Sequence, residues 1–128
     1  MPVTGELMKR EVVTIPAGAT IREALTEMKK RGIKSLVVEK RKPSDAYGII
    51  TFDEIAKAVI AEGANLDMLN VFDIAYRPAI QVSENLDVKY AVRLMVNLGI
   101  KRLLVIDNNE LKGMLSLTDA IYHFIDAN

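Results

Sequence analysis

The sequence contains no cysteine and only one histidine. The absence of cysteine excludes disulfides, thiolate nucleophiles and thiolate metal sites. The single histidine, His123, is accompanied by no second metal ligand and no nucleophile, so we interpret it as a surface or interface residue. No acid–base pair or activated nucleophile can be assembled from the residues present. We therefore predict that the protein is not an enzyme and requires no metal or cofactor.

An excess of charge of one sign is also absent, since 17 basic residues balance 17 acidic ones. A neutral chain has no overall field to hold nucleic acid or an anionic membrane, so any anion must be bound locally. No run of about 18 apolar residues occurs, and the N-terminal MPVTGELMKREVV has no stretch resembling a signal peptide. Half of the residues are apolar, which is enough for a folded core. We expect a folded cytoplasmic protein without a nucleic-acid or membrane partner.

The most informative feature present is an internal repeat. Shifted by 67 positions, IREALTEMKKRGIKSLVV (21–38) aligns without a gap with VKYAVRLMVNLGIKRLLV (88–105). After the following turn the offset becomes 65, as Gly48 and Gly113 show. The identical pairs include Arg10/Arg77, Ala24/Ala91, Met28/Met95, Gly32/Gly99, Ile33/Ile100, Lys34/Lys101, Leu36/Leu103 and Val38/Val105. A chance match would not hold this register, so we infer two copies of one unit.

Each copy is predicted to fold as a strand, a helix, two strands and a helix. Apolar residues recur at helical spacing over 20–31 and 87–98, and Thr20 and Asp87 are typical N-caps of these helices. Short apolar runs such as SLVVE and RLLVI are typical of buried strands. The predicted fold class is therefore mixed α/β (α+β), with tandem β-α-β-β-α repeats.

We place the first repeat at residues 1–62 and the second at residues 73–128. A linking helix is predicted between them, over residues 63–72. Gly32 and Gly99 are predicted to end the first helix of each repeat in the left-handed conformation. The pair of repeats is expected to form one folded module.

Both repeats close with a strand-to-helix corner that carries a hydroxyl and, three residues later, an acid. GIITFDEIA (48–56) and GMLSLTDAI (113–121) share this pattern. Backbone N–H groups at a helix start favour an anion, and a carboxylate there can accept two hydrogen bonds from the vicinal diol of a ribose. The alternative is ordinary helix capping by Ser116 or Thr118. The residues alone thus indicate either a cap or a sugar-phosphate site.

The first helices of the two repeats differ in their outer faces. The helix at 20–31 has a broad polar face, whereas the helix at 87–98 is apolar over most of its circumference. The polar residues of the second helix form one stripe: Lys89, Arg93 and Asn97. A helix of this kind needs cover on two sides. Burial within a single chain is one explanation; we predict instead a homodimer through the helices at 87–98 and 118–127.

The doubled plan resembles a pair of CBS domains, which are named after cystathionine β-synthase. The resemblance rests on GIK-x-L-x-V in the middle of each repeat and G-h-h-[ST]-x-x-[DE] at each last corner, and it covers residues 4 to 126. It implies a stand-alone pair, or Bateman module, whose repeats pack about a pseudo-two-fold axis and leave two clefts. In that family the clefts hold AMP, ADP, ATP or S-adenosylmethionine.

The second repeat matches the ligand positions of the family. The resemblance implies that Asp119 bonds the ribose hydroxyls, with Ser116 and Thr118 near the ribose or phosphate. It implies that Lys101 and Arg102 meet the phosphate. The implied adenine wall comes from the first repeat: Val12, Thr14 and Ile33.

The first repeat matches these positions less well. Thr51 and Lys34 correspond to family positions, but Glu54 stands where the family has aspartate and Ser35 replaces the basic residue. Glutamate is one methylene longer and would overshoot a diol placed for aspartate. The implied apolar wall of this cleft is Ala79 and Ile100. We therefore predict one good site, centred on Asp119.

The resemblance implies a regulatory module that senses an adenosine-containing ligand and passes a conformational change to a downstream protein. A second reading, from a different class, is a scaffold that keeps the fold and the dimer but binds no ligand. In that reading the two corners serve only as helix caps.

Overall fold

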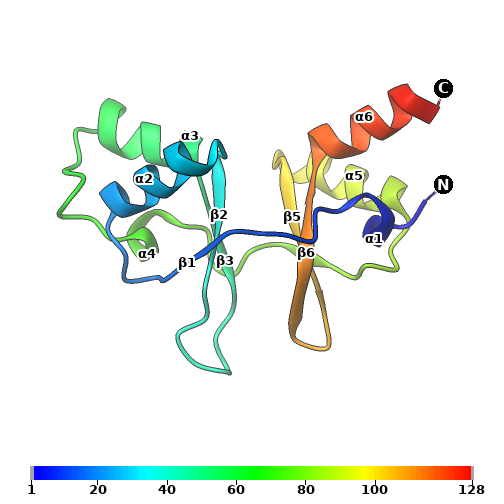
Figure 1. The fold of residues 1–128 in the computed structure, drawn as a ribbon, viewed down its shortest axis with the longest axis horizontal. Helices are drawn as coiled ribbons and strands as arrows, with labels where there is room; N and C mark the ends of the chain where they lie inside the picture. Colours follow the sequence, from blue (N-terminus) through cyan, green and yellow to red (C-terminus); the bar gives the residue numbers. More distant parts are fainter. Residues whose placement is uncertain (1, 128) are drawn as a thin grey trace. The chain divides into compact units, whose positions relative to one another are not determined.

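The computed structural model describes residues 2–127 and contains two compact units. The first unit comprises residues 13–79, and the second comprises residues 2–12 together with residues 80–127. Each unit is built around its own three-stranded sheet (Figure 1). Within the described residues, every helix is too short or too polar to span a bilayer.

The first unit has its helices on one side of the sheet (Figure 1). Its elements are β1 (Thr14–Ile15), α2 (Ile21–Arg31), β2 (Ser35–Val38), β3 (Gly48–Thr51), α3 (Phe52–Ala56), the π-helical turn η1 (Lys57–Ala61) and α4 (Val71–Ile74). The strand order is β1-β2-β3, in which β1 and β2 are parallel and β2 and β3 are antiparallel.

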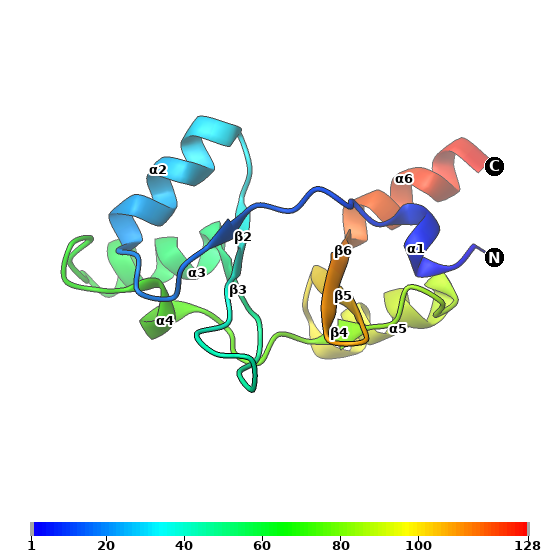
Figure 2. The ribbon, with the colours of Figure 1, turned by 60° about the horizontal axis from the view of Figure 1, so that its bottom comes forward.

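The second unit repeats this arrangement, again with its helices on one side of the sheet (Figure 2). Its elements are α1 (Thr4–Leu7), β4 (Gln81–Val82), α5 (Val88–Leu98), β5 (Arg102–Asp107), β6 (Glu110–Ser116) and α6 (Leu117–Ala127). The strand order is β4-β5-β6, parallel and then antiparallel. The predicted fold class, mixed α/β with two β-α-β-β-α repeats, is confirmed.

The predicted ends of α2 and α5 are confirmed. The Thr20 hydroxyl accepts the backbone N–H of Glu23 at 3.1 Å, and the Glu23 carboxylate accepts the N–H of Thr20 in return. The Asp87 carboxylate caps α5 by accepting a backbone N–H at 2.8 Å. Gly32 and Gly99 follow these helices in the left-handed region, with φ of 65° and 66°. An N-cap of this kind contributes about 1 kcal/mol, so local chemistry sets both helix lengths.

The two hydrophobic cores use the same positions of the repeat. The first core includes Ile21, Ala24, Met28, Leu36, Val38, Ile50 and Ile55. The second core includes Val88, Ala91, Met95, Leu103, Val105, Leu115 and Ala120. All these side chains are almost fully buried, and each large one contributes roughly 1.5–3 kcal/mol through removal of its surface from water. The repeat in the sequence therefore places apolar residues at the same buried positions in both units.

The first segment of each repeat packs with the core of the other repeat. Helix α1 comes first in the chain but lies beside α5 and α6 in the second unit (Figure 2). The N–H of Thr4 donates to the carbonyl of Leu86 at 2.7 Å, and 67 residues later the N–H of Val71 donates to the carbonyl of Ala19 at 2.8 Å. The two compact units therefore do not coincide with the two repeats along the chain, because the first segment of each repeat belongs to the unit formed by the other repeat.

The helix predicted over residues 63–72 is wrong. Residues 63–70 hold irregular backbone, a turn at 66–68 and a bridge at Asn70, and only the short α4, from Val71 to Ile74, is helical in this part of the chain. Gly63 has a φ of 75°, which a helix does not allow. The Asn65 side chain accepts the N–H of Asp67 at 2.8 Å, a local bond that competes with helix formation.

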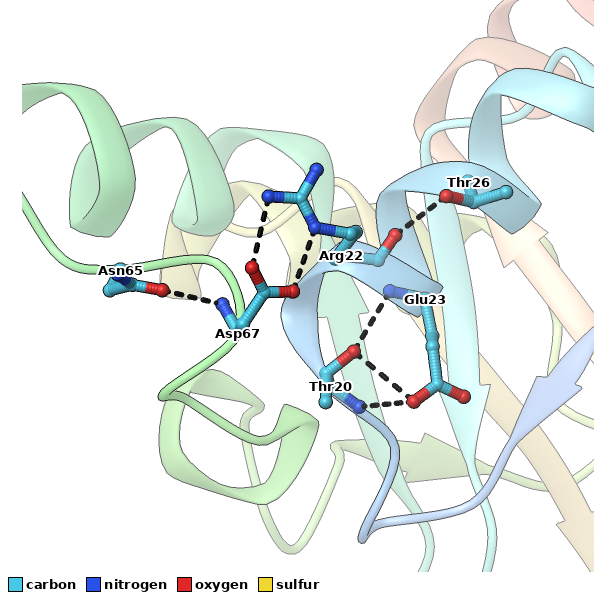
Figure 3. A network of polar contacts seen from close by, with 6 residues as sticks. All are labelled: Thr20, Arg22, Glu23, Thr26, Asn65 and Asp67. Carbon is cyan, nitrogen blue, oxygen red and sulfur yellow. Dashed lines mark hydrogen bonds and ion pairs between the residues drawn. The ribbon is translucent and has the colours of Figure 1, made fainter.

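A polar network holds this turn against α2 (Figure 3). The guanidinium of Arg22 donates two hydrogen bonds to the Asp67 carboxylate, at 2.7 and 3.0 Å. These bonds hold the pKa of Asp67 below its usual value. The Thr26 hydroxyl donates to the Arg22 carbonyl at 2.8 Å on the same face of the helix. The outer face of α2 is therefore polar and internally paired.

Candidate functional site

The strand-to-helix corner of the second unit lies where β6 runs into α6. The Ser116 hydroxyl accepts the N–H of Asp119 at 3.0 Å, so Ser116 caps the helix. The N–H of Leu117 donates to the carbonyl of Lys101 at 2.9 Å, which ties the helix start to the chain before β5. Thr118 is exposed in the first turn. The capping alternative is thus confirmed for Ser116, although its two oxygen lone pairs leave room for a second contact.

The carboxylate of Asp119 lies largely inside the protein, with 22% of the side chain exposed. Its Oδ2 atom is buried and accepts no hydrogen bond from any described residue. Its Oδ1 atom lies 3.9 Å from the ammonium of Lys9. A buried acceptor without a donor costs roughly 1–3 kcal/mol, and more for a charged group. Asp119 is therefore available to accept a hydroxyl or another donor.

Two basic residues of β5 and the segment before it adjoin this corner. Arg102 is paired directly across the sheet from Ser116, so the two side chains lie on the same face. The Arg102 side chain is half-buried, and Lys101 beside it is exposed. The structure thus brings together all five residues that the sequence predicted at this corner of the second unit: Lys101, Arg102, Ser116, Thr118 and Asp119.

Lys9 is a member of this corner that the sequence analysis missed. It arrives with the N-terminal segment, which forms an antiparallel bridge between Lys9 and Met114 of β6. The two backbone hydrogen bonds of this bridge are both 2.9 Å long. No local pattern around Lys9 marks it as a site residue. Lys9 reaches Asp119 only because the first segment of each repeat packs with the core of the other repeat, which we call the exchange of segments. The sequence offers one signal for these positions: the 67-residue shift of the repeat aligns Lys9 with Tyr76.

The corner of the first unit has the same construction. The Thr51 hydroxyl accepts the N–H of Glu54 at 3.5 Å, and the N–H of Phe52 donates to the Lys34 carbonyl at 2.8 Å. Ser35 is buried and paired directly across from Thr51, as Arg102 is from Ser116. The structure therefore brings Lys34, Ser35, Thr51 and Glu54 together.

The acid of this corner contacts a phenol. Tyr76 occupies the position equivalent to Lys9, and its neighbour in the bridge is Ile49 of β3. Hydrogen bonding to Glu54, together with the negative charge of Glu54, raises the pKa of Tyr76. The Oε2 atom of Glu54 is buried and, within residues 2–127, has no assigned hydrogen-bond partner. The two corners thus share an acid with one buried carboxylate oxygen and differ in the group that contacts this acid.

The predicted wall residues are divided between the two units. Val12 is half-buried in the second unit, where Ile100 packs against the core. In the first unit, Ile33 packs against the core and Ala79 is buried. Thr14 is exposed on β1, and its hydroxyl donates to Glu39 at 2.9 Å. Their roles as adenine contacts stay predictions.

A groove of about 780 Å³ runs along α2 and β1 of the first unit, and Thr14 lines it. The charged side chains along this groove are already paired. Arg22 binds Asp67, Arg31 binds Glu27 at 2.8 Å, and Glu23 belongs to the N-terminal cap of α2. The groove therefore presents a neutralised surface and no concentration of one charge.

The exposed apolar side chains of the second unit gather on α5 and α6. Each of the following is at least 49% exposed: Tyr90, Val96, Leu98, Ile121, Tyr122 and Ile125. At the positions equivalent to Tyr90, Val96 and Leu98, α2 carries Glu23, Lys29 and Arg31 instead. The predicted apolar outer face of the helix at 87–98 is confirmed.

The sequence matches a known family along almost its whole length. A sequence model of the CBS domain family matches residues 3–61 and 71–126. The chain is similar to an uncharacterized protein from Methanopyrus kandleri, with 36% identity over 118 residues. The match covers 91% of this chain and 60% of that relative, so the chain spans about three fifths of the relative's length.

Two solved structures resemble this one closely. A hexameric CBS-CP12 protein from bloom-forming cyanobacteria is 33% identical, with a TM-score of 0.92 over 98% of this chain and 74% of that chain. A CBS domain protein from Pyrobaculum aerophilum, in complex with AMP, is 31% identical, with a TM-score of 0.82 over 98% of this chain and 99% of that chain.

Proposed function

Because the chain belongs to the CBS domain family, we propose that it is a regulatory module that binds an adenosine-containing ligand and signals by a conformational change. The ligands in question are AMP, ADP, ATP and S-adenosylmethionine. The observation that supports this best is the buried Oδ2 of Asp119, an acceptor without a donor among the described residues, at a corner to which Lys9, Lys101 and Arg102 belong. The AMP complex of the Pyrobaculum relative supports an adenosine ligand. The proposal assigns the chain no catalytic activity.

The chemistry of the corner suits a ribose phosphate. The Asp119 carboxylate would accept hydrogen bonds from the ribose diol, which relieves the cost of its unpaired oxygen. Arg102 and Lys101 would neutralise the phosphate, and Thr118 would contact it at the start of α6. The proposed adenine contacts are Val12, Thr14 and Ile33. A second, weaker site would use Lys34, Ser35, Thr51 and Glu54, with Ala79 and Ile100.

Signalling follows from differential binding. A ligand that binds one arrangement of the repeats better than another shifts the protein toward that arrangement. A downstream protein that reads this shift is part of the proposal.

A thermal-shift panel tests ligand binding. A ligand at about 100 times its Kd stabilises the native state by about 2.7 kcal/mol, which raises Tm by roughly 10 °C in a chain of this size. We expect AMP or ATP at millimolar concentration to raise Tm by several degrees, and GMP to raise it less. Melting temperatures that stay constant across AMP, ADP, ATP and S-adenosylmethionine would contradict the proposal.

A scaffold that binds no ligand is the second candidate. The caps made by Ser116 and Thr51 favour it, because these hydroxyls already have a structural partner. Capping does not account for the buried carboxylate oxygens of Asp119 and Glu54. The same panel separates the two candidates, since the scaffold requires a constant Tm.

We further propose that the chain forms a homodimer through α5 and α6. These two helices carry six large apolar side chains that are exposed in the single chain, and exposed apolar groups of this number mark interaction sites. The hexameric assembly of the cyanobacterial relative supports self-association in this family. Pairing of two identical apolar faces is the simplest closed arrangement.

Ile125→Glu is expected to raise the dissociation constant of this dimer at least about tenfold, because a charge replaces an apolar contact at the interface. Ile125 is 64% exposed in the single chain. The matched control is Ile60→Glu, at the equivalent position 65 residues earlier, where Ile60 is 82% exposed. Sedimentation velocity over a concentration series measures the constant. A monomeric wild type, or equal effects of the two substitutions, would contradict the proposed interface.

A further inference from the structure

The backbone of Lys9 is fixed beside the Asp119 corner. Its N–H donates to the Met114 carbonyl and its carbonyl accepts the Met114 N–H, both at 2.9 Å. The preceding residue, Met8, is buried in the second core. Met114 lies two residues before Ser116 on β6, so the Lys9 side chain starts on the same face of the sheet as Ser116 and Arg102.

The ammonium of Lys9 keeps most of its hydrogen-bonding capacity. Its side chain is 71% exposed, and its one ion pair within residues 2–127, with Oδ1 of Asp119, is 3.9 Å long. An ammonium has three donors, and an ion pair of this length and exposure contributes little to stability. The position of Lys9 is thus better explained by a second anion near Asp119 than by the ion pair alone.

The charges around this corner are unbalanced. The segments that form this corner carry Lys9, Lys101 and Arg102 and one acid in contact with them, Asp119, in a chain whose total charge is zero. The local excess of positive charge raises the concentration of anions at the corner. A ligand that offers a hydroxyl to Asp119 and a negative group to the cations satisfies both features at once.

The corner of the first unit lacks this excess. Tyr76 takes the place of Lys9 and Ser35 takes the place of Arg102, while Lys34 remains equivalent to Lys101. A phenol that is hydrogen-bonded to Glu54 brings no positive charge to that corner. The two corners therefore differ in charge, because the exchanged segment brings a lysine to one corner and a tyrosine to the other.

We infer that Lys9 is a specificity-determining residue that makes the Asp119 corner select anionic nucleotides over uncharged nucleosides and over the sulfonium of S-adenosylmethionine. The inference rests on the proposed function and names the class of ligand within it. The hydroxyl contact to Asp119 is common to all adenosine ligands. The contact to Lys9 is available only to those that carry a phosphate next to the ribose.

Titration calorimetry with AMP and with adenosine tests the role of Lys9. We expect Lys9→Met to weaken AMP binding about three- to tenfold, the effect of one exposed charge pair with a doubly charged partner. Adenosine binding should change less than twofold. The matched control is Lys112→Met, which removes the same charge from β6, the strand to which the Lys9 segment is bridged, and there Lys112 pairs with Glu110 at 2.9 Å. It should leave both affinities unchanged.

Two results would overturn the inference in different ways. If Lys9 only screens the charge of Asp119, then Lys9→Met should strengthen the binding of AMP and of adenosine equally. The ratio of the two affinities should then stay constant. Such a result overturns the role of Lys9 and leaves the proposed function standing, because the wild type still binds AMP. Failure of the wild type to bind either ligand overturns both.

A conservative variant separates charge from packing. Lys9→Arg keeps the positive charge and should retain AMP selectivity within about threefold of the wild type. The selectivity of the wild type should also fall as salt is raised from low to high concentration, because an exposed charge pair is screened. Loss of AMP selectivity in Lys9→Arg would count against an electrostatic role for Lys9. A ratio of AMP to adenosine affinity that does not change with salt would count against it as well.

Discussion

Asp119→Ala is expected to weaken AMP binding about ten- to a hundredfold, because a hydrogen bond to a charged group contributes roughly 1.5–3 kcal/mol. The substitution removes the carboxylate of the corner whose Oδ2 is buried without a donor among the described residues. Isothermal titration calorimetry measures the change. The effect should appear with AMP, ATP and adenosine alike, since all three offer the same ribose diol to the carboxylate.

The control for Asp119→Ala is Asp126→Ala on the same helix. Asp126 is exposed near the end of α6 and should not affect AMP binding. Asp119 also lies in the first turn of α6, where a negative charge stabilises the helix by about 0.3–1 kcal/mol. Urea denaturation of both variants therefore accompanies the titrations. An AMP affinity unchanged in a folded Asp119→Ala variant removes Asp119 from the site.

Gly113→Ala is expected to lower the free energy of unfolding by about 1–3 kcal/mol, the usual cost of an added group in a packed position. A methyl group on Gly113 would overlap the carbonyl oxygen of Lys9 and lie 2.9 Å from the sulfur of Met8. The backbone of the N-terminal segment would have to move. Its two hydrogen bonds to Met114 hold it in place and make that movement costly.

The matched control is Gly18→Ala, where an added methyl group has no neighbour within 4 Å. Its φ lies outside the left-handed region, so alanine fits, and the substitution should leave stability unchanged or raise it by up to about 1 kcal/mol. Equilibrium unfolding in urea compares the two variants. Equal stabilities would mean that the segment carrying Lys9 can shift at no cost, which contradicts the tight approach described for Gly113.

Most of the fold could be predicted from the sequence because its determinants are local. The caps at Thr20 and Asp87 and the glycines at 32 and 99 act within one helical turn. The buried positions follow the spacing of the repeat. The helix predicted over 63–72 failed because Gly63 and the side-chain bond of Asn65 favour turns there.

The candidate site was predictable only in part, for a related reason. The corner residues Ser116, Asp119 and Arg102 lie close together because one strand pair and one helix start hold them. They come from consecutive elements of the chain, so a short stretch of sequence contains their pattern. Lys9 and Tyr76 reach their corners through the exchange of segments, which no local pattern encodes. The same exchange explains why the longer side chain of Glu54 is accommodated, since it meets the phenol of Tyr76.

The exchange of segments makes the two halves of the chain depend on each other for folding. A fragment that ended before α4 would hold β1 to η1 but would lack Val71, which is fully buried in its core. The remaining fragment would lack α1 and Met8, which complete the second core. A chain with a single copy of the repeat could complete its core only if a second molecule supplied this segment, whereas here both copies belong to one polypeptide and supply it to each other.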